Sequence, residues 1–286
     1  MTTEDVPGLL LSDAGWDVQR LDLDAYLSRI SYAGDRAPTL ANLALLHRAH
    51  IANVPFENLD VVLGRGIDAD LAGVQEKIVT RGRGGYCYEM NVLFGAALEV
   101  LGFAVERRLA RVGDQHIKVA PRSHLVLIVT VDDVPFLADV GFGSGLLGPA
   151  VLVDGAEFQQ GAWSYRLHVA QDRSWWLQTL RDGQWAAAYT VPAEATYPID
   201  VTVANHFTST YPSSPFVRSG IVMRKDASVV RGLRGRQLSV LRADGTESSV
   251  EVADDEFAGA LAALGIVLDE DEVRALLARP EMLTVE

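Results

Sequence analysis

The chain has 286 residues, enough for two or three domains with a substantial hydrophobic core. It carries 25 Lys and Arg against 38 Asp and Glu, and this acidic excess argues against a nucleic-acid partner because phosphate binding needs clustered basic residues. The sequence has no apolar run as long as a membrane span and no basic signal-peptide start in residues 1–11, and its single cysteine excludes an internal disulfide. We therefore expect a soluble cytoplasmic protein that does not bind membranes.

The first part of the chain has helical periodicity. An apolar stripe with helical spacing runs through residues 23–30, and Thr39 is a suitable N-cap for a second helix that begins at Leu40. A third apolar helical pattern begins just after Cys87. We predict that residues 1–103 form a helical domain.

Cys87 lies in the segment Arg81-Gly-Arg-Gly-Gly-Tyr-Cys-Tyr-Glu-Met-Asn91, where glycines come before the cysteine and helix formers follow it. This pattern places Cys87 at a helix N-terminus, where unpaired N–H groups and the helix dipole stabilise a thiolate. Arg81 and Arg83 would add positive charge. A lone cysteine is more often a small buried apolar residue, so a nucleophilic role depends on a nearby base.

The next segment supplies a candidate base in a predicted hairpin. Two apolar strand-like runs, 123–131 and 134–142, are separated by a two-residue Asp-Asp turn. The register of this turn makes His124 and Asp139 diagonal neighbours on one face, roughly 7 to 8 Å apart along the backbone. Asp139 would orient the imidazole, whose other ring nitrogen takes the proton of a thiol.

The middle of the chain has the pattern of short strands. Apolar runs between 104 and 191 alternate with polar turns such as Asp154-Gly155 and Asp182-Gly183. Residues 104–198 are therefore predicted to be mostly β, as a barrel or sandwich that carries His124 and Asp139.

The last part mixes both patterns. We expect a helix near 201–210, strands near 217–224 and 237–241, and helices at 254–264 and 270–277. Residues 199–286 are predicted to form an interdomain helix and a small α/β lid.

Four segments in order resemble motifs of the arylamine N-acetyltransferases, and three of them match the Cys-His-Asp triad of that family. The matching segments are Val54-Pro-Phe-Glu-Asn-Leu-Asp60, Arg83-Gly-Gly-Tyr-Cys-Tyr-Glu89, the region of His124, and Asp139-Val-Gly-Phe-Gly143. The resemblance runs from about Leu21 to about Met223. This chain departs from the pattern at Met90, where a polar residue such as His or Gln is expected, and in residues 1–20, which precede the matched region.

The resemblance implies an α+β multidomain fold with a helical first domain, a β-barrel second and an α/β third. Cys87 would come from the first domain and the His124–Asp139 pair from the second, in a triad like that of cysteine proteases. The implied activity is transfer of an acetyl group from acetyl-CoA to Cys87, and then to an arylamine or arylhydrazine, in a ping-pong reaction.

The same resemblance suggests binding residues. Gly141-Phe-Gly-Ser-Gly145 is rich in residues that let backbone N–H groups point at an anion, and the resemblance makes that anion coenzyme A. The candidate coenzyme A contacts are Ser123, Gly141, Gly143, Ser144 and Ser214. The candidate acceptor contacts are Phe56, Phe142 and Phe216. The remaining histidines show no metal-ligand spacing, so we assign no metal.

Three alternatives share parts of this pattern. An amide synthase of the same fold, which closes a macrolactam, would carry the same triad. A cysteine hydrolase or transglutaminase-like enzyme would use the same Cys-His-Asp chemistry without coenzyme A. A catalytically silent binding module would not use this chemistry. The acceptor amine, the acyl chain and the oligomeric state, with a homodimer as one option, stay open.

Overall fold

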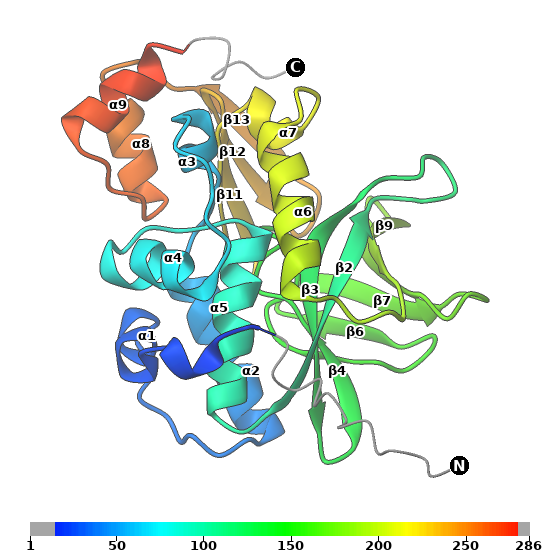
Figure 1. Cartoon of the computed structure of the whole chain (residues 1–286). Coiled ribbons are helices and arrows are strands. Elements are labelled where there is room, and N and C mark those ends of the chain that lie inside the picture. Colours follow the sequence, from blue (N-terminus) through cyan, green and yellow to red (C-terminus); the bar gives the residue numbers. More distant parts are fainter. Residues whose placement is uncertain (1–14, 280–286) are drawn as a thin grey trace, which may run out of the picture.

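The computed structural model describes residues 15–279, in which helices pack against two antiparallel sheets (Figure 1). The helices are α1 (Leu23–Arg29), α2 (Leu40–Asn53), α3 (Leu59–Val62), α4 (Leu71–Gln75), α5 (Cys87–Val100), α6 (Pro198–Thr210), α7 (Pro215–Arg218), α8 (Phe257–Ala263) and α9 (Glu270–Leu277). The strands are β1 (Phe56–Glu57), β2 (Ala104–Val112), β3 (Arg122–Val131), β4 (Val134–Ala138), β5 (Ala150–Val151), β6 (Glu157–Gln160), β7 (Trp163–Val169), β8 (Trp175–Arg181), β9 (Gln184–Val191), β10 (Ile221–Lys225), β11 (Val229–Arg234), β12 (Gln237–Arg242) and β13 (Glu247–Glu251).

The helical region is built around α5. Every residue of α5 from Cys87 to Leu98 is buried, because α1, α4, β2 and β3 all pack against this helix. The predicted cap of α2 is confirmed, since Thr39 Oγ1 accepts the backbone N–H of Asn42 at 3.3 Å. The start of α5 at Cys87 is confirmed as well.

The predicted barrel takes the form of a curled eight-stranded sheet with the order β5-β4-β3-β2-β9-β8-β7-β6. The β3–β4 register agrees with the prediction from the turn: Val131 pairs with Val134, and Leu127 pairs with Ala138. Asp132 and Asp133 have φ values of 50° and 61°, as a tight turn between twisted strands requires.

The second sheet has the order β1-β10-β11-β12-β13, so its first strand comes from the VPFENLD segment far away in sequence. The strand predicted at 217–224 is wrong at its start, because Pro215–Arg218 forms α7 and the strand begins at Ile221. Ser214 caps α7, and Pro215 at its first position favours a helical turn over a strand.

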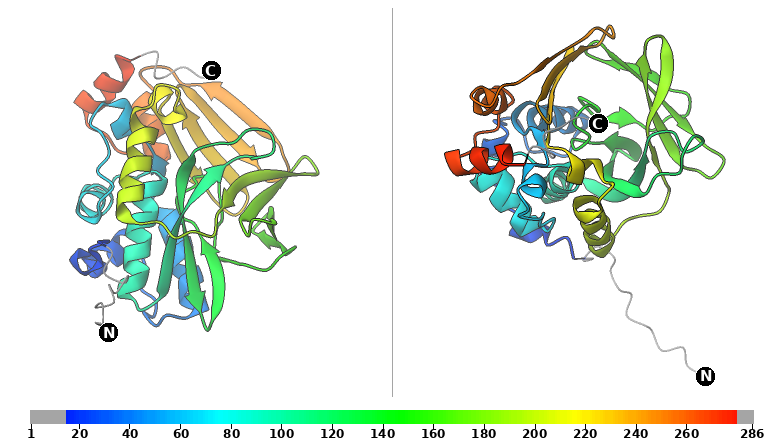
Figure 2. Two further views of the ribbon diagram at one scale, coloured as in Figure 1. Left: turned by 45° about the vertical axis from the view of Figure 1, so that its right-hand side comes forward. Right: turned by 90° about the horizontal axis from the view of Figure 1, so that it is seen from above.

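Helix α6 connects the two sheets along the chain, and it packs beside β3 (Figure 2). Helix α8 begins at Phe257, three residues later than predicted, because residues 254–256 form a turn. Helix α9 matches the prediction. No helix within residues 15–279 has the length and apolar character needed to cross a membrane. Residues 1–11, and most of the extension at 1–20, lie outside the described part.

Candidate active site

Cys87 is the first residue of α5, and only 3% of its surface is exposed. The segment after β4 comes unusually close to it. A Cβ atom at Gly141 would lie 2.7 Å from the Cα of Cys87 and 2.6 Å from Nδ2 of Asn91, so only glycine fits there. The Cys87 thiol also lies 3.7 Å from the carbonyl oxygen of Ser123, on the strand that carries His124. The helix start and the β3–β4 segment are therefore packed directly on each other.

Buried charges support the start of α5. Lys77 Nζ lies 2.8 Å from Glu89, 3.4 Å from Asp60 and 3.7 Å from Glu57. Arg83 lies 3.0 Å from Glu57 and 3.6 Å from Asp60. Arg83, which the sequence suggested as a support for the thiolate, is thus paired with carboxylates of the VPFENLD segment. This ion cluster holds the loop before Cys87 in place.

Arg81 also differs from the expectation. Its guanidinium is half-exposed and lies 4.0 Å from Asp60. Glu89, the third residue of α5, accepts the backbone N–H of Tyr86 at 3.0 Å and so satisfies a donor at the helix start. The arginines and Glu89 therefore act on the position of Cys87 through the loop and the helix start.

His124 and Asp139 meet in the interior. Nε2 of His124 lies 2.8 Å from Oδ2 of Asp139, and both residues are at most 2% exposed. Asp139 lies just beyond the end of β4, and its side chain reaches the same face as that of His124. The rings of Phe142 and Tyr189 pack on the imidazole with centroid separations of 5.0 and 4.9 Å.

The electrostatics of this pair favour two charges. Burial alone lowers the pKa of His124, but the Asp139 carboxylate, followed by the sulfur of Cys87, raises it to about 10. Burial alone would raise the pKa of Asp139, but His124 and the hydrogen bonds from Asn91 and Gly141 hold it below its ordinary value. At neutral pH the pair is therefore an imidazolium and a carboxylate.

Two residues that sequence reasoning missed hold Asp139. Asn91 donates to Oδ1 of Asp139 at 2.9 Å and to the carbonyl of Leu125 at 2.7 Å. Nε2 of His47, on α2, accepts the backbone N–H of Asp139 at 3.2 Å. The position of Asn91 one helical turn after Cys87 was a usable signal, because residues four apart share a helix face. No local signal pointed from His47 to Asp139.

A cavity of about 370 Å³ opens over Cys87 and His124. The three aromatic residues predicted to bind the acceptor, Phe56, Phe142 and Phe216, all line its wall. Three of the predicted coenzyme A contacts also line it, namely Ser123, Gly141 and Ser214. The cavity is lined mainly by apolar groups, with Lys118 also in its wall, and it brings the thiol of Cys87 and the imidazole of His124 to one accessible space.

A family profile for N-acetyltransferases matches residues 39–273. The arylamine N-acetyltransferase of Mycolicibacterium smegmatis is 38% identical over 234 residues, 79% of this chain and 85% of the relative. The chain belongs to the arylamine N-acetyltransferase family. Its resemblance to that family, inferred from four motifs, is therefore confirmed.

Solved structures of arylamine N-acetyltransferases have the same fold. The enzyme of Nocardia farcinica superposes with a TM-score of 0.86 at 40% identity, covering 91% of this chain and 95% of that one. The Mycobacterium marinum enzyme, solved in complex with CoA, gives 0.80 at 32% identity, covering 91% and 98%. The mixed helix and sheet architecture predicted from the sequence is thereby confirmed.

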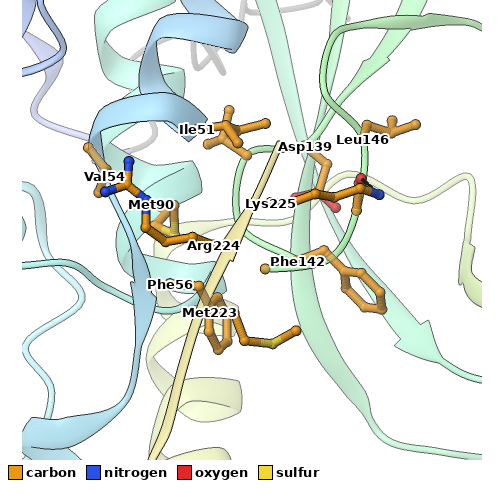
Figure 3. A pocket seen from close by; sticks show the side chains of 13 residues that line it. Ile51, Val54, Phe56, Met90, Asp139, Phe142, Leu146, Met223, Arg224 and Lys225 are labelled. Carbon is orange, nitrogen blue, oxygen red and sulfur yellow. Dashed lines mark hydrogen bonds between the residues drawn. The ribbon is translucent and has the colours of Figure 1, made fainter. Parts of the chain in front are cut away.

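Two predicted coenzyme A contacts that line the cavity, Gly141 and Ser214, make internal hydrogen bonds, and the other two, Gly143 and Ser144, are not part of its wall. The N–H of Gly141 donates to Oδ1 of Asp139 at 2.9 Å, and the hydroxyl of Ser214 donates to the carbonyl of Thr208 at 2.6 Å. Gly143 lines a small space behind the cleft, between Asp139 and β10 (Figure 3). The carbonyl of Ser144 accepts a hydrogen bond from Lys225. Within residues 15–279, no cluster of His, Cys, Asp and Glu could hold a metal ion.

Proposed function

We propose that this chain is an acetyl-CoA-dependent arylamine N-acetyltransferase that carries the acetyl group on Cys87 as a thioester. The observation that carries the proposal is the shared cleft. Cys87 and His124 both line it, and Asp139 keeps the His124 ring charged from the buried side. Membership of the family supports acetyl-CoA as the donor and an arylamine or arylhydrazine as the acceptor.

In the first half-reaction, the His124 imidazolium and the N-terminus of α5 stabilise the Cys87 thiolate. The thiolate attacks the thioester carbonyl of acetyl-CoA, the carbon–sulfur bond to coenzyme A breaks, and the departing thiolate takes the proton from His124. One thioester is exchanged for another, so this step is close to neutral in energy. Backbone N–H groups at the start of α5 are suited to hold the oxyanion.

In the second half-reaction, the acceptor nitrogen attacks the acetyl group on Cys87. His124, now neutral, takes the proton from that nitrogen while the Cys87 thiolate departs, which restores the initial ion pair. Asp139 compensates the returning charge on the ring. Transfer from a thioester to an amide runs downhill, so it drives the cycle forward.

The cleft wall supports an aromatic acceptor. Phe56 and Phe216 lie with ring centroids 6.0 Å apart, and Phe142 borders the same space next to His124. Aromatic rings offer both apolar area and preferred edge-to-face contacts to a planar amine.

Intact-protein mass spectrometry tests the proposal directly. After incubation with acetyl-CoA and no amine, the wild-type chain should gain the mass of one acetyl group and lose it when an arylamine is added. Cys87→Ala should gain none, and its thermal unfolding should show that it still folds. Acetylation that persists in Cys87→Ala would refute the thioester, and acylation of the wild type that only water discharges would favour a hydrolase.

A further inference from the structure

Lys225, the last residue of β10, is a buried cation whose hydrogen-bond acceptors come from the loop after β4 and from β7. Only 7% of its surface is exposed. Its ammonium group donates to the carbonyls of Ser144 at 2.8 Å and Gly145 at 2.7 Å, and to the hydroxyl of Tyr165 at 2.5 Å. Three donors therefore meet three acceptors, which is the full hydrogen-bonding capacity of a charged lysine.

None of these acceptors is a carboxylate. The ammonium also lies 4.2 Å from the ring centroid of Trp163 and 5.1 Å from that of Tyr165, so aromatic faces replace the usual counter-ion. Burying a charge without an ionic partner costs free energy. Because this charge binds one short backbone segment, a function of that segment would account for the cost.

The segment is 141–145, which turns back directly after Asp139. Its Gly141 and Phe142 line the cleft over Cys87, whereas Lys225 is not among the residues of that cavity. Figure 3 shows Lys225 reaching from β10 towards the segment that carries Phe142 and Leu146, while Arg224 points the other way. The hydroxyl of Tyr165 donates to Gly145 at 2.8 Å and so joins the same network from β7.

We propose that Lys225 is a positioning residue for substrate binding, which holds segment 141–145 in the shape that forms the cleft wall. The proposal rests on the proposed function, because the ligand it concerns is coenzyme A or its acetyl ester. Lys225 acts through the backbone of Ser144 and Gly145 and touches neither the substrate nor the reacting atoms. The contacts of Lys225 also tie β10 of the second sheet to segment 141–145 and, through Tyr165, to β7 of the curled sheet.

The contact responds to pH near neutrality. Burial, followed by the charge of Arg181 on β8, lowers the pKa of Lys225 to about 7. Tyr165 on β7 is the other titratable group that faces the ammonium, and burial raises its pKa, so it stays neutral. Arg224 precedes Lys225 on β10, and Asp226, just after the strand, is paired with Arg231 at 2.8 Å. Above neutral pH the amine has one donor fewer, and one contact to the segment is lost.

The decisive measurement is the affinity for free coenzyme A, by calorimetry, in the wild type and in Lys225→Met. Loss of the charge-assisted contacts that hold segment 141–145 should raise the Kd about tenfold. The KM for acetyl-CoA should rise in parallel, while the rate of Cys87 acylation at saturation should change less than about twofold. Arg234→Met, which removes an exposed cation at the end of β11, is the matched control and should leave both values unchanged.

Two further readouts distinguish positioning from simple loss of stability. The wild-type Kd should rise between pH 6 and pH 8, and that part of the pH dependence should disappear in Lys225→Met. Tyr165→Phe should show a smaller loss that is not additive with Lys225→Met, because both act on Gly145. Unchanged affinity in Lys225→Met with only a lower melting temperature would overturn the proposal. If Lys225→Met does not fold, a flat wild-type pH profile with normal affinity in Tyr165→Phe would overturn it too. A wild type that does not bind coenzyme A at all would instead refute the proposed function.

Discussion

Two buried histidines contact Asp139, and they differ in charge: the electrostatics favour a cationic His124 and a neutral His47. His124, from the curled sheet, meets the carboxylate at 2.8 Å, and its pKa is raised to about 10. His47, from the helical region, meets the backbone N–H of the same residue at 3.2 Å, and burial lowers its pKa to about 4. Burial lowers the pKa of both rings. The difference comes mainly from Asp139, whose carboxylate meets His124 and whose backbone N–H meets His47, and Cys87 adds to the rise at His124.

A second neutral histidine lies on the same helix as His47. His50, one turn after His47, binds the hydroxyl of Tyr26 at 2.9 Å, and its pKa is lowered to about 3, mainly by burial. Both rings pack around Phe94, with centroid separations of 5.7 and 5.6 Å. His47 and His50 are therefore neutral groups on the helical side of Asp139, and the carboxylate of Asp139 pairs with His124. The comparison shows how one protein uses the same side chain once as a charge carrier and twice as a neutral hydrogen-bonding group.

The largest expected effect comes from removing the carboxylate charge of Asp139, which keeps His124 cationic while His47 stays neutral. Asp139→Asn keeps the size of the side chain but can no longer stabilise an imidazolium, and it favours the wrong ring tautomer. We expect kcat/KM to fall on the order of 10⁴-fold, with little change in unfolding temperature. Steady-state acetylation of an arylamine and a thermal melt measure both quantities. A near-normal rate would show that His124 does not depend on Asp139.

A smaller effect should appear in the pH dependence of stability. Below pH 6.5 an unfolded chain protonates His47 and His50, whereas the folded chain does not until about pH 4 and pH 3. The free energy of unfolding should therefore fall with decreasing pH across this window, by about 1.4 kcal/mol per pH unit for each ring. His124 has the opposite sign: its stabilisation is complete below pH 6.5 and is lost as pH rises through about 10.

Urea unfolding between pH 4 and pH 7 measures the acid slope. His50→Gln should reduce it by about the contribution of one histidine. Equal slopes in the variant and the wild type would mean that His50 is protonated in the folded protein.

The smallest expected effect is on stability, and it distinguishes the role of His47 as a hydrogen-bond acceptor from the space that its side chain fills. His47→Leu leaves the buried N–H of Asp139 without an acceptor, which should cost about 1 to 3 kcal/mol of stability. His47→Gln offers an amide oxygen to the same N–H and should recover most of that loss. Chemical denaturation at pH 7 compares the two variants. If leucine proves as stable as glutamine, the contact to Asp139 has no energetic weight.

Much of the site followed from short-range rules. The Asp132-Asp133 turn sets the register of β3 and β4, and that register brings His124 to the side of Asp139. The glycines before Cys87 and the helix formers after it place the cysteine at the start of α5. The prediction was wrong where two local signals competed. At Pro215 a capped helical turn precedes the strand, so the strand begins later than predicted.

What the sequence by itself determined is therefore local: helix starts, the hairpin register and the family motifs, because each depends on residues that are neighbours along the chain. The tertiary structure alone decided the pairing of β1 with β10, the contact of His47 with Asp139 and the contact of Lys225 with segment 141–145. It also decided which histidine is charged. Burial and the direction of a hydrogen bond depend on groups that are distant in sequence, and no pattern along the chain records where those groups meet.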